Sequence, residues 1–212
     1  MRHESDQDYS AWLLPAVEAS LASAQATLSQ VNLFAVAAGP GSFTGLRVGL
    51  TSVKAWAEVY GRPIVPVSRL EALAGRASEG GSPFVAAFVD ARRDQIFAGL
   101  YLRRDGVIQL VGEQAVLSAA NFLDYVGEQA GTDRVDWVSL DPEHLTLHPG
   151  WAARASRGES VLGVEPVLAP AIGQIALRRA QAGQVVDALS LDANYVRRSD
   201  AEIFWKGAAH GK

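Results

Sequence analysis

A glycine-rich run from Gly39 to Leu50, with the sequence GPGSFTGLRVGL, offers the clearest chemistry in this chain. Free backbone amides at the start of a helix favour an anion, and Ser42 or Thr44 is suited to cap such a helix. The spacing does not match a P-loop, which needs a lysine after its last glycine, or the dinucleotide pattern G-x-G-x-x-G. Pro40 also removes one amide donor. The run therefore predicts a strand-to-helix turn without a complete phosphate motif.

Other residues whose side chains could take part in catalysis or metal binding are scattered along the chain. His144 and His148 have the i, i+4 spacing of two metal ligands on one helix face, but prolines flank them and no third ligand is evident. We therefore favour exposed loop histidines over a metal site. Asp90, Arg92 and Arg93 are interpreted as a solvated turn between strands. The chain has no cysteine and no G-x-S-x-G sequence, so thiolate catalysis is excluded and serine catalysis has no support.

The elements that position the glycine run are two helices and two strands. Apolar residues at helical spacing predict a helix at 10–25, with Ser10 as its N-cap, and a continuously apolar segment predicts a strand at 33–37. A second helix at 42–60 and a short strand at 64–67 follow. Strand, helix and strand in this order imply a parallel, right-handed unit.

The second predicted helix has two distinct faces. Its apolar face contains Leu46, Leu50, Val53 and Ala57, and its small-residue face contains Gly45, Gly49 and Ser52. A glycine inside a helix costs about 1 kcal/mol relative to alanine, so the small-residue face favours close packing by another backbone. That packing could be within the chain. Because an amphipathic helix stands directly upstream, a two-helix surface that docks a second protein is the sharper hypothesis.

The remainder of the chain predicts a mixed α/β region after a Gly-Ser-Pro break at 79–83. Three strands of an antiparallel meander are expected, joined by polar turns. The predicted elements are a helix at 69–78, strands at 84–89, 96–102 and 107–111, a helix from Ser118 to 129, a strand at 137–140 and a helix at 171–182. The stretch 141–166 gives no regular pattern.

Composition limits the classes of protein that fit. The 212 residues carry a formal charge of −4, which argues against a dedicated nucleic-acid binder, so we expect any contact with RNA to be indirect. No stretch of about 18 apolar residues occurs, so no membrane span is predicted. The absence of cysteine and of a signal-peptide pattern favours the cytoplasm.

Several blocks of the sequence match a known protein family. These blocks are Leu13-Leu-Pro15, residues 34–49, residues 66–73, Val89-Asp-Ala-Arg-Arg93 and residues 194–202. On these residues the chain resembles the TsaB (YeaZ) family, a bacterial subunit needed to make threonylcarbamoyladenosine on tRNA. The resemblance covers most of the chain, and residues 39–47 are its most diagnostic part.

The resemblance implies an α/β fold with two lobes, similar to actin, sugar kinases and Hsp70 ATPases. It places the first lobe at residues 1–82, completed by a C-terminal helix at 195–212, and the second lobe at 83–194. Family members usually begin with a strand, an Asp-Thr-Ser-like turn and a hairpin, whereas this chain begins just before the first helix. We therefore expect an N-terminally truncated first lobe with unpaired strand edges. Tyr9-Ser10 also stands where His-Ser is usual.

The resemblance also implies a role. Such a protein is a non-catalytic subunit that binds and supports the catalytic subunit TsaD, together with the ATPase TsaE, in forming N6-threonylcarbamoyladenosine at position 37 of tRNA. The contact with TsaD uses two helices, which correspond to 10–25 and 42–60 here. A homodimer through the same surface is an alternative. The partner-contact residues expected on these helices are Trp12, Leu13, Leu14, Val17, Gly41, Ser42, Phe43, Thr44, Gly45, Arg47, Gly49 and Ser52.

No catalytic, cofactor or metal residue of this chain's own is implied. ATP or ADP held at the interface with the partners stays an open alternative. The alternative function is a stand-alone ATP-dependent acyl transferase or peptidase of the same superfamily. The lack of cysteine, of a convincing metal set and of a complete phosphate motif argues against it.

Overall fold

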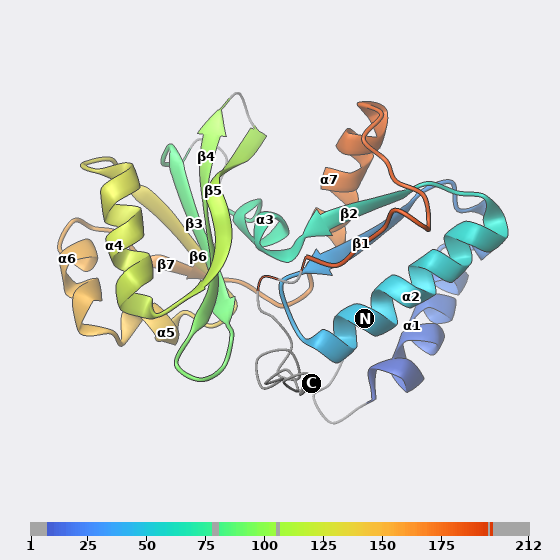
Figure 1. Ribbon diagram of the computed structural model, residues 1–212, viewed down its shortest axis with the longest axis horizontal. Coiled ribbons are helices and arrows are strands. Elements are labelled where there is room, and N and C mark those ends of the chain that lie inside the picture. Colours follow the sequence, from blue (N-terminus) through green and yellow to red (C-terminus); the bar gives the residue numbers. More distant parts are fainter. Residues whose placement is uncertain (1–7, 78–80, 105–106, 195, 197–212) are drawn as a thin grey trace, which may run out of the picture.

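The strands of this chain form two separate sheets, which lie side by side in Figure 1. The structure is a computed structural model that describes residues 8–77, 81–104, 107–194 and 196. A parallel two-stranded sheet contains β1 (Phe34–Gly39) and β2 (Ile64–Ser68), and a five-stranded sheet has the order β5-β4-β3-β6-β7. We call these sheets, with the helices that cover them, the small-sheet unit and the large-sheet unit.

The small-sheet unit confirms the predicted strand, helix and strand around the glycine run. β1 and β2 pair in parallel, with Phe34 opposite Ile64. Helix α2 (Phe43–Tyr60) packs on β1, and α1 (Tyr9–Ser23) packs on α2. Helix α7 (Ala169–Gln181) follows the large sheet in the chain, yet it packs on β2 and β1. The small sheet is therefore packed against two helices, α2 and α7.

The apolar face predicted for α2 is confirmed. Leu50, Val53 and Ala57 are buried against Phe34 and Val36 of β1, and Leu46 packs beside them partly buried. The ends of α2 also agree with the sequence. Ser42 caps its start by accepting a hydrogen bond from the backbone N–H of Gly45 at 3.3 Å. Gly61 ends it in the left-handed conformation with φ 60°, which glycine adopts without a Cβ clash.

The start of α1 differs from the prediction. Asp8, not Ser10, is the N-cap, because its carboxylate accepts the backbone N–H of Ser10 at 2.9 Å. The N-cap thus lies two residues earlier than predicted, and the helix begins at Tyr9. Pro15 lies inside it on an exposed side of the chain.

The large-sheet unit contains the predicted antiparallel meander. Strands β3 (Phe84–Asp90), β4 (Ile96–Arg104) and β5 (Val107–Leu117) pair in sequence order, and β6 (Val135–Ser139) joins β3 in parallel. β5 is longer than the predicted strand because it continues past a break in register opposite residues 98–100 of β4. Helix α4 (Ala119–Ala130) covers this unit and is capped by Ser118, as predicted. The Asp-Gly turn at 105–106 lies outside the described residues.

Several boundaries were wrong, and one region held more structure than expected. Helix α3 (Arg69–Ala74) is shorter than the predicted 69–78. The stretch 141–166 is not irregular throughout: it contains α5 (Glu143–Thr146), a 3-10 turn η2 (Pro149–Trp151), α6 (Ala152–Ala155) and β7 (Val161–Gly163), while a further 3-10 turn η1 (Leu28–Gln30) precedes β1. β6 begins two residues before the predicted strand, and α7 two residues before the predicted helix. The C-terminal helix predicted at 195–212 lies outside the described residues, apart from Val196.

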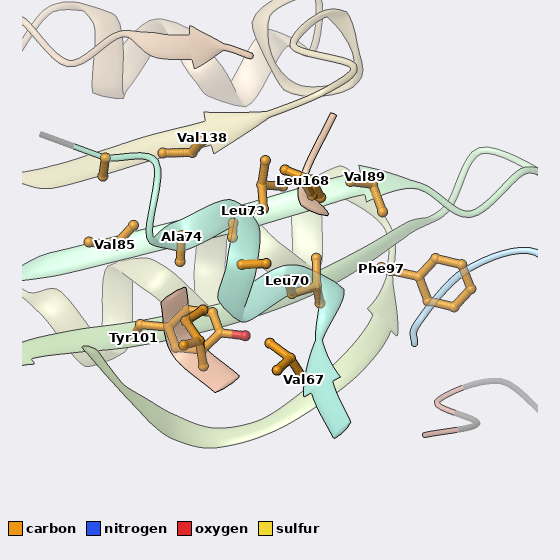
Figure 2. Close-up of a cluster of buried hydrophobic side chains, with 14 of the residues drawn as sticks. Val67, Leu70, Leu73, Ala74, Val85, Val89, Phe97, Tyr101, Val138 and Leu168 are labelled. Carbon is orange, nitrogen blue, oxygen red and sulfur yellow. The ribbon is translucent and has the colours of Figure 1, made fainter. Parts of the chain in front are cut away.

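Helix α3 joins the two units through a shared apolar core. Val67 of β2, Leu70 and Leu73 of α3, and Val85 and Tyr101 of the large sheet belong to one buried cluster. Figure 2 shows α3 between the ribbons of both units, with Leu70 and Leu73 directed into this cluster. No helix in the described part of the chain combines the length and apolar character needed to cross a membrane.

Candidate partner-binding surface

Helices α1 and α2 lie side by side on the outside of the small-sheet unit (Figure 1). Their first turns meet, because a Cβ atom placed on Gly45 would lie 3.5–3.6 Å from the aromatic ring of Tyr9. The absence of a side chain at Gly45 lets this ring lie close to α2. The two helices therefore form one surface, which the sequence analysis predicted.

Helix α1 is apolar on nearly every side, so the prediction of an amphipathic helix was wrong. It carries one charged residue, Glu18, in 15 residues, and no basic or acidic residue in its first or last turn. Ala16 is buried and Trp12, Leu13 and Val17 are partly buried, but Leu14 is 50% exposed and Tyr9 is 38% exposed. A helix that is apolar all round is normally covered on all sides. Here its principal neighbour among the described elements is α2.

The start of α2 adds an aromatic side chain and a cation to this surface. Phe43 is 39% exposed, and the guanidinium carbon of Arg47 lies 3.9 Å from its ring centroid. This distance is typical of a cation–π pair, which holds both side chains in place. Thr44 and Arg47 are exposed, whereas Ser42 is engaged as the helix cap. Aromatic residues and arginine are the types enriched among residues that dominate binding energy in interfaces.

The small residues of the glycine run lie against other parts of the chain. Gly45 faces Tyr9, Gly49 faces the side chain of Val36 at 4.0 Å, and Gly41 faces the guanidinium of Arg69 at 3.4 Å from the position of a Cβ. Ser52 is partly buried. The exposed residues of α2 are instead Phe43, Thr44, Arg47, Thr51, Ala55, Glu58 and Val59. The structure therefore exposes Leu14 on α1 and Phe43, Thr44 and Arg47 on α2, leaves the other predicted residues of α1 partly buried, and turns Gly45 and Gly49 toward the chain itself.

Sequence reasoning missed Tyr9 as part of this surface. Its signal was available, because Tyr9 precedes Trp12 by three residues and Leu13 by four, the spacing of neighbours on one helix face. The resemblance to the family shows Tyr9 only as a departure from the family pattern. In the structure its ring covers Gly45 and fixes the start of α1 on α2.

Two charged groups lie near the first turns of these helices. The backbone N–H and hydroxyl of Ser10 hydrogen-bond to Asp8 and hold the pKa of its carboxyl below the ordinary 3.8. Burial lowers the pKa of Arg69, at the start of α3, and the negative charge of Asp141 opposes that shift. The guanidinium of Arg69 beside Gly41 places a cation next to the glycine turn.

The remaining candidate residues contact other parts of the chain. The expectation of exposed loop histidines was wrong, because His144 lies in α5 and both His144 and His148 are partly buried. The Nε2 atom of His144 lies 3.6 Å from Asp90, and Nδ1 of His148 accepts the backbone N–H of Gly150 at 3.1 Å. Asp90 also accepts the backbone N–H of Arg92 at 2.7 Å, and the Arg92 side chain is 89% exposed, as a solvated turn requires. The part of the chain that the structure describes contains no group of three histidine, cysteine, aspartate or glutamate side chains suited to a metal ion.

Comparisons with known proteins agree on one family. Residues 3–139 match the model of the family "TsaD: tRNA N6-adenosine threonylcarbamoyltransferase". Over 201 residues the chain is 28% identical to the tRNA threonylcarbamoyladenosine biosynthesis protein TsaB of Bacillus subtilis, covering 94% of this chain and 84% of that protein. The chain belongs to this family, in its TsaB/YeaZ branch.

Further members of the TsaB/YeaZ branch give the same result. The Escherichia coli protein TsaB is 28% identical over 202 residues, with 92% of this chain and 81% of that protein covered. The solved structure of YeaZ from Pseudomonas aeruginosa aligns with a TM-score of 0.65 at 28% identity, covering 88% of this chain and 83% of the other. The mixed α/β fold expected from the resemblance is thus confirmed as YeaZ-like, of the type shared with actin and sugar kinases.

Proposed function

We propose that this chain is a non-catalytic subunit of the machinery that forms N6-threonylcarbamoyladenosine at position 37 of tRNA. It acts in the cytoplasm by binding and supporting the catalytic subunit TsaD, together with the ATPase TsaE, and it contacts tRNA only indirectly. Membership of the TsaB/YeaZ branch supports the pathway, because its relatives are named tRNA threonylcarbamoyladenosine biosynthesis proteins. The binding mode is argued from α1 and α2.

The observation that carries the binding mode is the exposed apolar surface that remains on α1 beside α2. Leu14 and Tyr9 are left half-exposed on a helix with a single charged residue. Contiguous exposed apolar patches on folded proteins often mark sites of interaction with other proteins. Phe43 and Arg47 are exposed on the first turns of α2, the helix that Tyr9 contacts at Gly45. We infer that two helices of TsaD pack on this pair and complete a four-helix arrangement.

The test is binding of purified chain to purified TsaD, measured by isothermal titration calorimetry and size-exclusion chromatography. Leu14→Ser removes an apolar side chain that is half-exposed in the free chain. Covering that exposed half is worth about 1 kcal/mol at roughly 25 cal/mol per Å², and the new hydroxyl adds a similar penalty if it is buried without a partner. The affinity should therefore fall by about ten- to thirtyfold, since each 1.4 kcal/mol is about tenfold.

The matched control is Leu177→Ser on α7, because Leu177 is 56% exposed and lies on another helix. This variant should bind TsaD like the unmodified chain. Equal affinity of the Leu14→Ser variant and the unmodified chain would refute the proposed surface. If the chain alone elutes as a dimer and Leu14→Ser makes it monomeric, the same face also joins two copies, and TsaD binding should then compete with dimerisation.

A further inference from the structure

A cavity of about 680 Å³ lies between the two units, on the side where α7 faces β5. Its walls come from both units. Ser68 and Glu71 line it from the end of β2 and from α3, Tyr101 and Gln114 line it from β4 and β5, and Asn194 lines it from the segment after α7. Four of these five side chains, all except Glu71, form one hydrogen-bonded network across the cavity.

Gln114 is the centre of that network. Its Nε2 atom donates to the hydroxyl of Ser68 at 2.6 Å and to the hydroxyl of Tyr101 at 2.9 Å. Its Oε1 atom accepts from Nδ2 of Asn194 at 2.9 Å. The partners Ser68 and Asn194 lie 46 and 80 residues away in the sequence. One amide of the large-sheet unit is therefore bonded to the end of β2 and to the segment after α7 that contacts β1.

Both of those segments are themselves held firmly. The hydroxyl of Ser68 caps α3 by accepting the backbone N–H groups of Leu70 and Glu71 at 3.2 and 3.3 Å. The backbone N–H of Asn194 donates to the carbonyl of Ala38 at 2.7 Å. Its carbonyl oxygen would lie 2.6 Å from a Cβ at Gly39, so only a glycine allows the segment this close to β1. The side chain of Gln114 is therefore bonded to two groups, on Ser68 and Asn194, that are themselves held in place by the hydrogen bonds described above.

The apolar core shared by the units does not fix their angle in the same way. Apolar contact is non-directional, whereas a hydrogen bond weakens steeply when its distance or angle changes. In Figure 2 the hydroxyl of Tyr101 points toward Val67 and Leu70. Burial raises the pKa of Tyr101 far above its ordinary range, so the hydroxyl keeps its proton as part of the network.

We propose that Gln114 is a latch that holds the small-sheet unit and the large-sheet unit at one angle, through its bonds to Ser68 and Asn194. When these bonds break, the units rotate about α3 and the cavity opens. This role goes beyond the binding of TsaD, because the proposed docking surface lies on α1 and α2 and contains none of the latch residues. The proposal gives a structural role to Asn194. This residue belongs to the block 194–202 that resembles the TsaB family, and the proposed TsaD-binding surface includes no residue of that block.

The test measures the distance between the units directly. The chain has no cysteine, so spin labels can be placed at Val59→Cys on α2 and Glu128→Cys on α4, two exposed positions in different units. Dipolar electron resonance then gives the distance distribution. Gln114→Leu should broaden this distribution and shift it by more than its width in the unsubstituted chain.

Gln109→Leu is the matched control, because Gln109 lies on the same strand and lines the same cavity but is not part of the network. It should leave the distribution unchanged. Asn194→Ala removes one latch bond at an exposed position and should broaden the distribution even if Gln114→Leu fails to fold. An unchanged distribution in both Gln114→Leu and Asn194→Ala, or equal broadening by Gln109→Leu, would overturn the proposal. If the chain does not bind TsaD, the proposed role of Gln114 is unaffected, because the distance measurement does not involve TsaD.

Discussion

Replacing Gly45 with alanine should stabilise this chain, which is the opposite of what a docking role for Gly45 implies. Alanine is favoured over glycine within a helix by up to about 1 kcal/mol, and somewhat less in the first turn, where Gly45 lies. The new Cβ would meet the ring of Tyr9 at 3.5–3.6 Å, an ordinary van der Waals distance. The free energy of unfolding should therefore rise by about 0.5–1 kcal/mol.

A larger side chain at the same position should have the reverse effect. Gly45→Leu drives three further carbon atoms into the space of the Tyr9 ring, and overpacking of this kind costs about 1–3 kcal/mol. Because Tyr9 begins α1, the helix should shift on α2, so binding to TsaD should weaken along with stability. Gly49→Ala is the control inside the same helix, since its nearest neighbour, Val36, lies 4.0 Å away.

The assay is urea unfolding followed by circular dichroism, together with calorimetric titration of TsaD. For a chain of this size, 1 kcal/mol corresponds to a change in melting temperature of about 2–4 °C, so thermal unfolding gives an independent reading. The reasoning is refuted if Gly45→Ala destabilises the chain. It is also refuted if Gly45→Ala weakens TsaD binding about tenfold while the fold is more stable, because the glycine face would then touch the partner directly.

Two further predictions concern charged groups. The carboxylate of Glu159 is fully buried, with the Nη1 atom of Arg154 3.6 Å and the Nε atom of Arg157 3.9 Å away. Arg154→Met leaves Arg157 in place, so it should lower the free energy of unfolding by less than the about 3–5 kcal/mol of a fully unpaired buried charge, as measured in a urea titration. Adding Glu159→Gln should restore most of this loss, and no restoration would contradict the pairing. The pKa of Asp8 is lowered in the fold, so its cap stabilises α1 above the ordinary 3.8 and is lost as the pH falls through the folded value. Amide exchange in the first turn of α1 should therefore quicken in acid, and an equal acid response in Asp8→Asn would count against this.

The sequence predicted the elements that carry strong local signals. Helix α2 was placed almost to the residue because Ser42 and Gly61 mark its ends and its apolar face is regular. The meander was visible because polar turns separate its strands. These features depend on neighbours a few residues apart, which a single sequence displays.

What the sequence could not give depends on contacts between distant residues. β5 extends beyond its prediction because it wraps past a register break on β4, which composition does not reveal. That Gly45 and Gly49 face other parts of the chain could be learned only from the positions of Tyr9 and Val36 in the fold. The bond from Asn194 to Gln114 spans 80 residues, so neither residue carries a local sign of it.

The most direct test of the proposed function is a site-specific photo-crosslink to TsaD. The chain contains no cysteine, so a benzophenone can be attached at Leu14→Cys on α1, with Glu128→Cys on α4 as the control position. On illumination of the mixture, the account predicts a covalent product with TsaD from the label at position 14 and little from position 128. A product from position 128 with none from position 14 would contradict it.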